Sequence, residues 1–212
     1  MVKTLLYSVI SVVILYVVEQ YLEVNYLIKT VVKIGLFCVV PILLVRDFTF
    51  LKWSAVRKSS FLLTVGVALC GFFGILVGYH VLQSFIDPAA IVHDLTARLE
   101  ISKTTFIFVA VYICLCNSFL EEFFFRGWLF QSLQKHSSVA AYVVSSLLFS
   151  GYHIAIFATW FHWSISLLAL VGLFMVGILF CFINEKNGSM YHSWFIHMMA
   201  NVAIILIGFQ LL

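Results

Sequence analysis

Long apolar runs follow one another along the chain and are separated by short polar stretches. A transmembrane helix needs about 20 apolar residues to cross a hydrocarbon core about 30 Å thick. The runs are continuous rather than alternating, which favours helices over a membrane β-barrel. We therefore predict an all-α polytopic bundle of about seven spans, with six or eight as alternatives, because the first run is short and the fifth and sixth nearly touch. The expected spans cover approximately residues 4–18, 27–45, 61–86, 104–131, 139–161, 163–183 and 190–212.

Composition points to lipid as the solvent for most of the surface. The chain has 212 residues, of which 64% are hydrophobic and 10% charged, and its mean hydropathy is +1.12. A soluble domain contains about 45–50% apolar and about 25% charged residues. We predict one integral membrane domain over residues 1–212, with N-terminal helices in 1–103 and a second group of helices in 104–212. The polar connection at 87–103 is expected to be a loop with room for a short interfacial helix.

The cysteines and the net charge argue against several other classes of protein. All five cysteines lie within apolar runs and none forms a Cys-x-x-Cys pair, so we interpret them as small buried apolar side chains. The formal net charge is only +3, and no basic cluster with interleaved aromatic residues indicates binding of nucleic acid.

The Lys and Arg residues predict an orientation, because cytoplasmic loops of membrane proteins carry an excess of them. With seven spans and an inner N-terminus, eight of these residues fall on the inner side and four on the outer side. This bias favours a cytoplasmic N-terminus. The inner set is Lys3, Arg46, Lys52, Arg57, Lys58, Arg126, Lys135 and Lys186, and the outer set is Lys29, Lys33, Arg98 and Lys103.

Two adjacent carboxylates, Glu121 and Glu122, lie inside the fourth apolar run. An ionised group at the bilayer centre costs about 2.5–3.5 kcal/mol on insertion scales, so each needs a partner or a function. Arg126 follows Glu122 by four residues, which is the favourable order for a helical ion pair. Glu121 and Arg126 lie roughly 140° apart on a helix of 3.6 residues per turn, which leaves Glu121 without a partner on its own helix face. Glu121 is therefore the candidate functional residue.

Polar residues interrupt two further apolar runs. Phe149 and His153 share one helix face at i, i+4, and so do His197 and Asn201. Such residues often act as hydrogen-bonding links between membrane helices, and an intramembrane carboxylate with two histidines is also compatible with the proton relay of a transporter or channel. Gathered in one bundle, however, the three clusters supply a carboxylate, two imidazoles and a carboxamide, which is a hydrolytic set.

The roles of these groups follow from the chemistry of peptide hydrolysis. A buried carboxylate can activate water as a general base, and an imidazole that shares the water can orient it and pass a proton to the leaving amine. A His and an Asn one turn apart can offer two donors to the tetrahedral oxyanion. We expect the Glu121 carboxylate and the His153 imidazole to lie roughly 4–6 Å apart inside the bundle, within reach of one water. No Ser or Cys residue stands out as a nucleophile.

The three ordered motifs, Glu-Glu-x-x-x-Arg, Phe-x-x-x-His and His-x-x-x-Asn, resemble those of the CAAX protease and bacteriocin-processing (Abi) family, also called type II CAAX prenyl endopeptidase-like. The resemblance covers roughly residues 104–204. It implies a polytopic intramembrane endopeptidase whose catalytic helices lie in 104–212. Under the resemblance, Glu121 is the catalytic acid and His153 shares the activated water, while His197 and Asn201 form the oxyanion site. Structural support would come from Glu122, Arg126 and Phe149.

The resemblance also sets expectations for substrate, location and cofactor. The substrate would be a hydrophobic or lipidated peptide or C-terminal tail, and the location a prokaryotic cell (inner) membrane. No cofactor is expected. Zinc held by Glu121, His153 and His197 is the alternative, although the sequence has no His-Glu-x-x-His motif and Asn is a poor zinc ligand. A non-catalytic immunity or scaffold protein of the same fold is the other alternative.

Overall fold

The computed structural model describes residues 1–22, 24–44, 48–52, 58–93, 96, 103–157 and 160–211, without the side chains of 58, 59, 103 and 104. The predicted fold class is confirmed, because these residues form helices and no strand, apart from one isolated bridge between Ile86 and Phe161. Seven helical stretches of the described residues are long and apolar enough to cross a membrane, as the sequence predicts. They are Val2–Gln20, Tyr26–Leu44, Ser60–Phe85, Thr105–Gln134, Ser138–Phe157, Trp163–Asn187 and Tyr191–Leu211.

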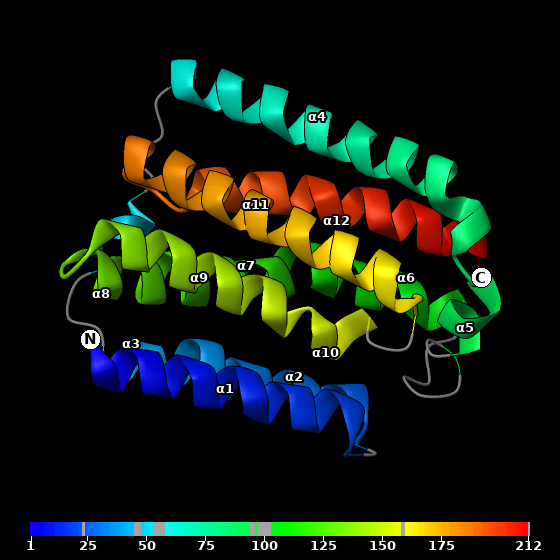
Figure 1. Ribbon diagram of the computed structural model, residues 1–212, viewed down its shortest axis with the longest axis horizontal. Helices are drawn as coiled ribbons and strands as arrows, with labels where there is room; N and C mark the ends of the chain where they lie inside the picture. The colour runs from blue at the N-terminus through cyan, green and yellow to red at the C-terminus, as the bar shows by residue number, and fades with distance from the viewer. Residues whose placement is uncertain are drawn as a thin grey trace.

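The spans run roughly side by side and stack in layers (Figure 1). Helices α1, α2 and α3 form one outer layer, and α4 forms the opposite one. Between them lie α6 to α9 and the pair α11 and α12. Helix α12 packs along α4, α11 packs along α9, and α1 packs along α9. The helices of the first half are α1 (Val2–Gln20), α2 (Tyr26–Ile34), α3 (Val40–Leu44), α4 (Lys58–Leu82) and α5 (Pro88–His93). The others are α6 (Lys103–Tyr112), α7 (Ser118–Glu122), α8 (Gln131–Gln134), α9 (Ser138–Tyr152), α10 (Ile154–Phe157), α11 (Trp163–Asn187) and α12 (Tyr191–Leu211).

The fourth span is wound unevenly, and this irregularity surrounds the two acids. π-helical segments precede and follow the short helix α7, at Ile113–Asn117 (η6) and Phe123–Phe130 (η7). Wider turns of this kind shift the register of the side chains, and they occur frequently at functional sites. A further π-helical segment, Gly35–Val39 (η1), joins α2 to α3. Two 3₁₀ turns complete the described elements, at Thr49–Leu51 (η2) and Gln83–Phe85 (η4).

Aromatic packing fixes the fourth span against the N-terminal layer. Phe37 of η1 is fully buried and stacks on Phe124 of η7, with ring centroids 4.1 Å apart and planes 9° apart. Tyr152 and Phe125 make edge contacts to the same Phe37 ring. Offset-stacked and edge-on pairs of this kind contribute about 0.5–1.5 kcal/mol each beyond their buried area. The N-terminal helices therefore form part of one core with the helices that carry the candidate site.

Small residues allow close contacts around α11. A Cβ atom on Gly177 would lie 2.8 Å from Ser146 Cβ and 3.0 Å from Ser146 Cα, so a larger side chain would push α11 away from α9. Gly188 ends α11 with φ of 68°, a left-handed conformation that glycine adopts at little cost. The turn that follows leads directly into α12, which carries His197 and Asn201.

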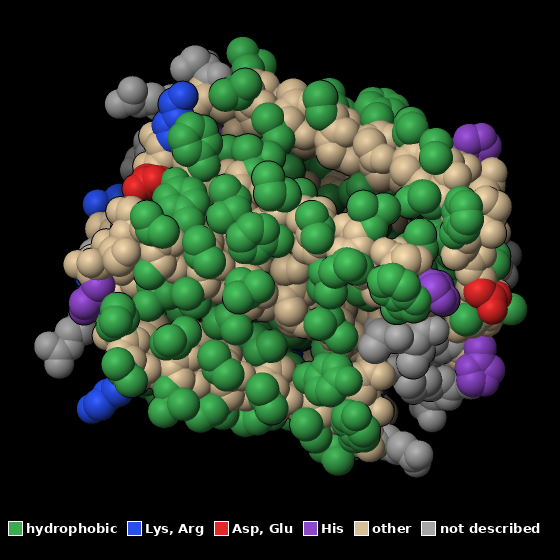
Figure 2. All heavy atoms as spheres, in the orientation of Figure 1, with side chains coloured by type: hydrophobic (Ala, Val, Ile, Leu, Met, Phe, Trp, Pro, Cys, Tyr) green, Lys and Arg blue, Asp and Glu red, His purple; other side chains and the backbone are tan. Residues whose placement is uncertain are grey.

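The surface is apolar along the spans, and its Lys and Arg side chains gather at one end of the visible face (Figure 2). Two lysines of the predicted outer set do not lie on this surface. Lys29 and Lys33 belong to α2, and their side chains are buried. Arg126, from the inner set, is buried as well. These three residues are therefore not loop charges, and the predicted count of inner and outer Lys and Arg residues is corrected by leaving them out.

Several other positions of that count cannot be placed. Arg46, Arg57 and Arg98 lie outside the described residues. In the expected loop at 87–103, α5 occupies Pro88–His93, while residues 94–95 and 97–102 are also outside the described part.

Candidate functional site

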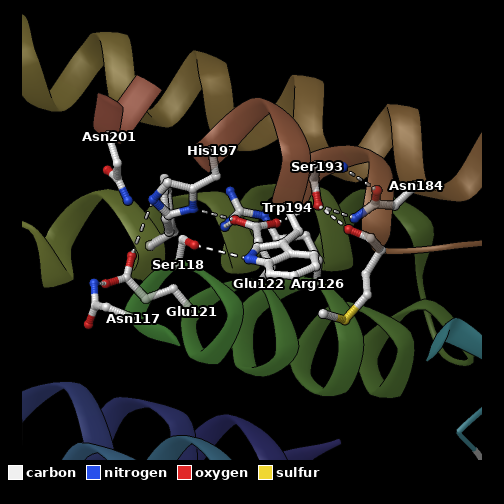
Figure 3. A network of polar contacts seen from close by, with 12 residues as sticks. Asn117, Ser118, Glu121, Glu122, Arg126, Asn184, Ser193, Trp194, His197 and Asn201 are labelled. Carbon is white, nitrogen blue, oxygen red and sulfur yellow. Dashed lines mark hydrogen bonds and ion pairs between the residues drawn. The ribbon is translucent and has the colours of Figure 1, made fainter. Parts of the chain in front are cut away.

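Helix α7 places both acids inside the bundle. Glu121 is 1% exposed and Glu122 is 0% exposed, and they face different neighbours because consecutive helical residues diverge by about 100°. Figure 3 shows their carboxylates reaching in different directions from α7, with α12 bringing Ser193, Trp194, His197 and Asn201 to the opposite side. The indole nitrogen of Trp194 donates to the Ser118 hydroxyl at 3.0 Å, which ties α12 to the start of α7.

One oxygen of Glu121 is held by the protein. Its Oε1 accepts a hydrogen bond from Nδ2 of Asn117 at 2.7 Å, and Nζ of Lys33 lies 3.8 Å from the same oxygen. Asn117 lies four residues before Glu121 on the same helix face. The expectation that Glu121 has no partner on its own helix face is therefore wrong, because it considered only charged residues that follow the acid and not an amide that precedes it.

The other oxygen of Glu121 faces two imidazoles. Oε2 accepts no hydrogen bond from any described residue. It lies 3.9 Å from Nε2 of His153 and 3.8 Å from Nε2 of His197. The 3.9 Å separation lies just below the expected range of roughly 4–6 Å. A buried carboxylate oxygen without a protein donor is uncommon and calls for a chemical explanation. Three heteroatoms from three spans thus converge within reach of one water molecule.

Phe149 and the end of α9 orient His153. His153 is the C-cap residue of α9, and its Nδ1 lies 2.8 Å from the carbonyl oxygen of Phe149. A carbonyl can only accept, so Nδ1 carries the hydrogen of this bond and Nε2 is the nitrogen presented to Glu121. The Phe149 ring packs at a steep angle against both imidazoles, with centroid distances of 4.6 Å to His153 and 5.8 Å to His197.

Glu122 orients the other imidazole. Its Oε1 lies 3.0 Å from Nδ1 of His197 and accepts from Nη1 of Arg126 at 3.1 Å, so the ion pair indicated by the i, i+4 spacing is present. Its Oε2 accepts from the Ser193 hydroxyl at 2.6 Å. A carboxylate that bonds one ring nitrogen of a histidine fixes the ring and the role of the other nitrogen. With Nδ1 held by Glu122, Nε2 of His197 faces Glu121.

Arg126 stacks on Phe149. Its guanidinium carbon lies 3.9 Å from the centroid of the Phe149 ring and 5.1 Å from that of Phe180. This cation–π contact is desolvated, because Arg126 is only 1% exposed. The residues predicted to give structural support, Glu122, Arg126 and Phe149, therefore contact one another or the two histidines directly.

Asn201 lies one turn after His197 on α12 and is 9% exposed. Its amide points toward the region between His197 and Glu121 (Figure 3). Nδ2 donates to the carbonyl oxygen of Ile113, the first residue of η6, at 3.1 Å. An amide nitrogen carries two hydrogens, so Asn201 keeps a second donor in addition to this backbone bond.

Sequence reasoning missed three polar residues that hold this arrangement. Asn117 could have been found from its i−4 spacing to Glu121. Ser193 lies four residues before His197, and it also bonds Asn184 through its hydroxyl at 2.7 Å. Lys33 is 84 positions from Asn117 in the chain but donates to its Oδ1 at 2.6 Å, and only the folded bundle reveals this contact.

The described residues contain no group of three or more His, Cys, Asp or Glu side chains arranged to hold a metal ion. The two imidazoles and Glu121 are the groups that would have to draw closer to bind zinc at its usual ligand distances of about 2.0–2.2 Å. In the arrangement as it stands, Oε2 of Glu121 lies 3.8–3.9 Å from the two ring nitrogens, well beyond a metal-ligand distance.

One protein family matches this part of the chain. The family model described as type II CAAX prenyl endopeptidase Rce1-like matches residues 103–203. All seven site and support residues predicted from sequence fall within this range, whereas Lys33 lies outside it. The match agrees with the resemblance drawn from the three motifs. No curated protein and no solved structure matches the chain.

Proposed function

Because residues 103–203 match the Rce1-like type II CAAX prenyl endopeptidase family, we propose that the chain is an intramembrane endopeptidase of this family. Its substrate is a hydrophobic or lipidated peptide or C-terminal tail, and its reaction is hydrolysis of a peptide bond by an activated water. The observation that carries the proposal is the free Oε2 of Glu121, buried and facing Nε2 of both His153 and His197.

The proposed reaction begins with a water between Glu121 and His153. Glu121 takes a proton from this water, and the water oxygen bonds to the carbonyl carbon of the substrate. The π electrons of the carbonyl move onto the carbonyl oxygen. His153 holds the water in line through Nε2. The oxyanion then re-forms the C=O bond as the C–N bond breaks, and the proton taken by Glu121 passes by way of His153 to the leaving amine nitrogen. General acid–base catalysis of this kind contributes typically about 10²–10⁴-fold in rate.

His197 and Asn201 act on the oxyanion in this proposal. Asn201 donates the amide hydrogen that is not bonded to Ile113. His197 donates from Nε2 when the ring carries both protons, while Glu122 accepts from Nδ1. Removal of one oxyanion donor from a preorganised site typically costs about 10²–10³-fold in kcat. Glu122, Arg126 and Phe149 support the reaction by fixing the two imidazoles.

We propose that this chemistry proceeds without a metal ion. A carboxylate base is sufficient to activate water, and Asn201, which belongs to the same set of groups, is a poor ligand for zinc. Zinc bound by Glu121, His153 and His197 is the competing mechanism, and it would activate the water as a Lewis acid instead.

The chain is an integral membrane protein, and we propose a prokaryotic inner membrane with a cytoplasmic N-terminus. Three of the exposed, described lysines support this orientation. Lys3, Lys135 and Lys186 lie at the end of the bundle that holds the N-terminus, the α8–α9 connection and the end of α11. Excess positive charge marks the cytoplasmic side of membrane proteins.

The test uses purified protein in liposomes with a panel of fluorogenic hydrophobic peptides, with and without a prenyl group. Glu121→Gln should reduce kcat/KM by at least about 10²-fold, the scale of general base catalysis. Glu185→Gln is the matched control, because this carboxylate is exposed at the end of α11, where it bonds Gln134 and Tyr142. Retention of more than half the activity in Glu121→Gln would end the assignment. Proton flux through Glu121 without any peptide cleavage would instead identify a transporter or channel.

A further inference from the structure

A lysine from the N-terminal helices reaches the candidate catalytic carboxylate. Lys33 lies on α2, in the part of the chain that precedes the family match, and it is 8% exposed. Its Nζ donates to Oδ1 of Asn117 at 2.6 Å, lies 3.8 Å from Oε1 of Glu121 and sits 5.0 Å from the centroid of the Tyr152 ring. An ammonium group inside a membrane span is costly and marks a functional role by default.

The contact with Lys33 determines which way the Asn117 amide points. An ammonium group offers only donors, so the oxygen of the amide must face Lys33. The nitrogen of the same amide then faces Glu121 and donates to Oε1 at 2.7 Å. The reverse orientation would place two acceptors, the amide oxygen and Oε1, against each other. Lys33 thus fixes Asn117, and Asn117 fixes one oxygen of Glu121.

The contacts of Lys33 and Asn117 also determine where Oε2 of Glu121, the reactive oxygen, points. With Oε1 held on the side of α2 by Asn117 and Lys33, Oε2 is directed to the side where Nε2 of His153 and Nε2 of His197 lie. A carboxylate that lost its hold on Oε1 could rotate about its last bond and present a different edge to the water. Misplacement of a reacting group by about 1 Å can cost about 10²-fold in rate.

We propose that Lys33 is a positioning residue of the hydrolytic site, acting on Glu121 through Asn117. The proposal rests on the proposed function for its kinetic consequence, and on the contacts alone for its effect on the Glu121 carboxylate. The N-terminal helices are therefore required for catalytic geometry as well as for packing, and residues 103–203 by themselves form an incomplete site.

The first experiment compares Lys33→Met with Lys29→Met. Lys29 is a matched control, because it lies one turn earlier on the same helix, is 4% exposed, and pairs with Glu19 at 3.3 Å instead of with the site. Lys33→Met should lower kcat by at least about tenfold with KM changed by no more than about twofold, since it disturbs the reacting geometry. Lys29→Met should lower thermal stability by a similar amount and leave kcat within about twofold. Equal losses of kcat in both variants would overturn the proposal.

A double variant tests the route through Asn117. If Lys33 acts by orienting Asn117, then Lys33→Met combined with Asn117→Leu should be no more than about twofold less active than Asn117→Leu alone, because residues that act as a unit are strongly non-additive. Losses that multiply would mean that Lys33 acts independently, which contradicts the proposal. Lys33→Gln keeps an amide donor and should recover part of the activity. It also provides a second test if Lys33→Met does not fold, as judged by size-exclusion elution in detergent.

An infrared experiment distinguishes failure of the positioning role of Lys33 from failure of the proposed protease function. The infrared carboxyl band of Glu121 is identified as the band that disappears in Glu121→Gln. It should shift in Lys33→Met and in Asn117→Leu and stay in place in Lys29→Met, whether or not a peptide is cleaved. An unshifted band in Lys33→Met would refute the positioning role even in an active protease. A shifted band in a protein that cleaves no peptide would support the positioning role of Lys33 and refute the proposed protease function.

Discussion

Arg126 is the residue whose removal should destabilise the fold most clearly. Its side chain is 1% exposed, donates from Nη1 to Oε1 of Glu122 at 3.1 Å, and stacks on the Phe149 ring at 3.9 Å. Arg126→Met keeps an unbranched side chain with a long apolar stem in the same space but removes the charge. Glu122, which is 0% exposed, would then remain in the bundle without its counterion.

The expected loss of stability depends on the hydrogen bonds that Glu122 keeps. Removal of one partner of a buried ion pair costs about 3–5 kcal/mol, because the other charge is left uncompensated. Glu122 retains its bonds from Ser193 and from Nδ1 of His197, so we expect the lower end of this range, about 3 kcal/mol. For a chain of 150–250 residues, each kcal/mol corresponds to about 2–4 °C in Tm, which gives a decrease of about 6–12 °C.

The measurement is thermal unfolding in detergent, followed by tryptophan fluorescence at fixed lipid and detergent concentrations. Lys186→Met is the control, because Lys186 is exposed near the end of α11 and surface substitutions usually change stability by no more than about 0.5 kcal/mol. The double variant Glu122→Gln with Arg126→Met removes both charges and should unfold at a higher temperature than Arg126→Met alone.

Two results would refute this reasoning. A decrease of less than about 3 °C in Arg126→Met, or about 1 kcal/mol on the same scale, would show that Glu122 does not depend on its counterion. A double variant no more stable than Arg126→Met would show that lost packing on Phe149, and not the uncompensated charge, causes the effect.

Two further predictions concern packing and the metal. Gly177→Ala should lower stability by about 1–3 kcal/mol, because its Cβ would lie 2.8 Å from Ser146 and overpacking costs about this much. Gly172→Ala is the control, because a Cβ there would have nothing within 4 Å, and it should unfold within about 2 °C of the parent chain. Prolonged dialysis against a strong chelator should leave peptide cleavage intact and elemental analysis should find no stoichiometric zinc. Recovery of activity only on addition of zinc would reassign Glu121, His153 and His197 as ligands.

The sequence predicted the spans and the convergence of the polar clusters because both depend on local rules. A run of about 20 apolar residues has few alternatives to a transmembrane helix. Groups at i, i+4 share a helix face, and so Glu122 bonds Arg126 as its spacing indicated. Ionisable groups inside membrane spans face the bundle interior, which is why clusters on three separate spans could be expected to meet.

The contacts that sequence reasoning missed depend on packing between distant elements. The sequence predicts Lys33 to be a loop charge because it lies near one end of its apolar run, and nothing local reveals that α2 places it beside Asn117. The π-helical segments on either side of α7 likewise change which side chains face inward, and a 3.6-residue period cannot predict such register shifts. The links from Glu122 to Ser193 and His197 required the packing of α12 against α7.

Two adjacent residues of the same type thus acquire different chemistry from their surroundings. Glu122 has donors on both of its oxygens, from Arg126, His197 and Ser193. Glu121 has donors on Oε1 alone and leaves Oε2 facing two ring nitrogens. A carboxylate with donors on both oxygens is a weaker base toward water than a carboxylate with one oxygen that accepts no hydrogen bond. The division of roles therefore depends on which side of α7 each acid faces: Glu122 faces the polar groups of α12 that fix His197, and Glu121 faces the space that α2, α9 and α12 share.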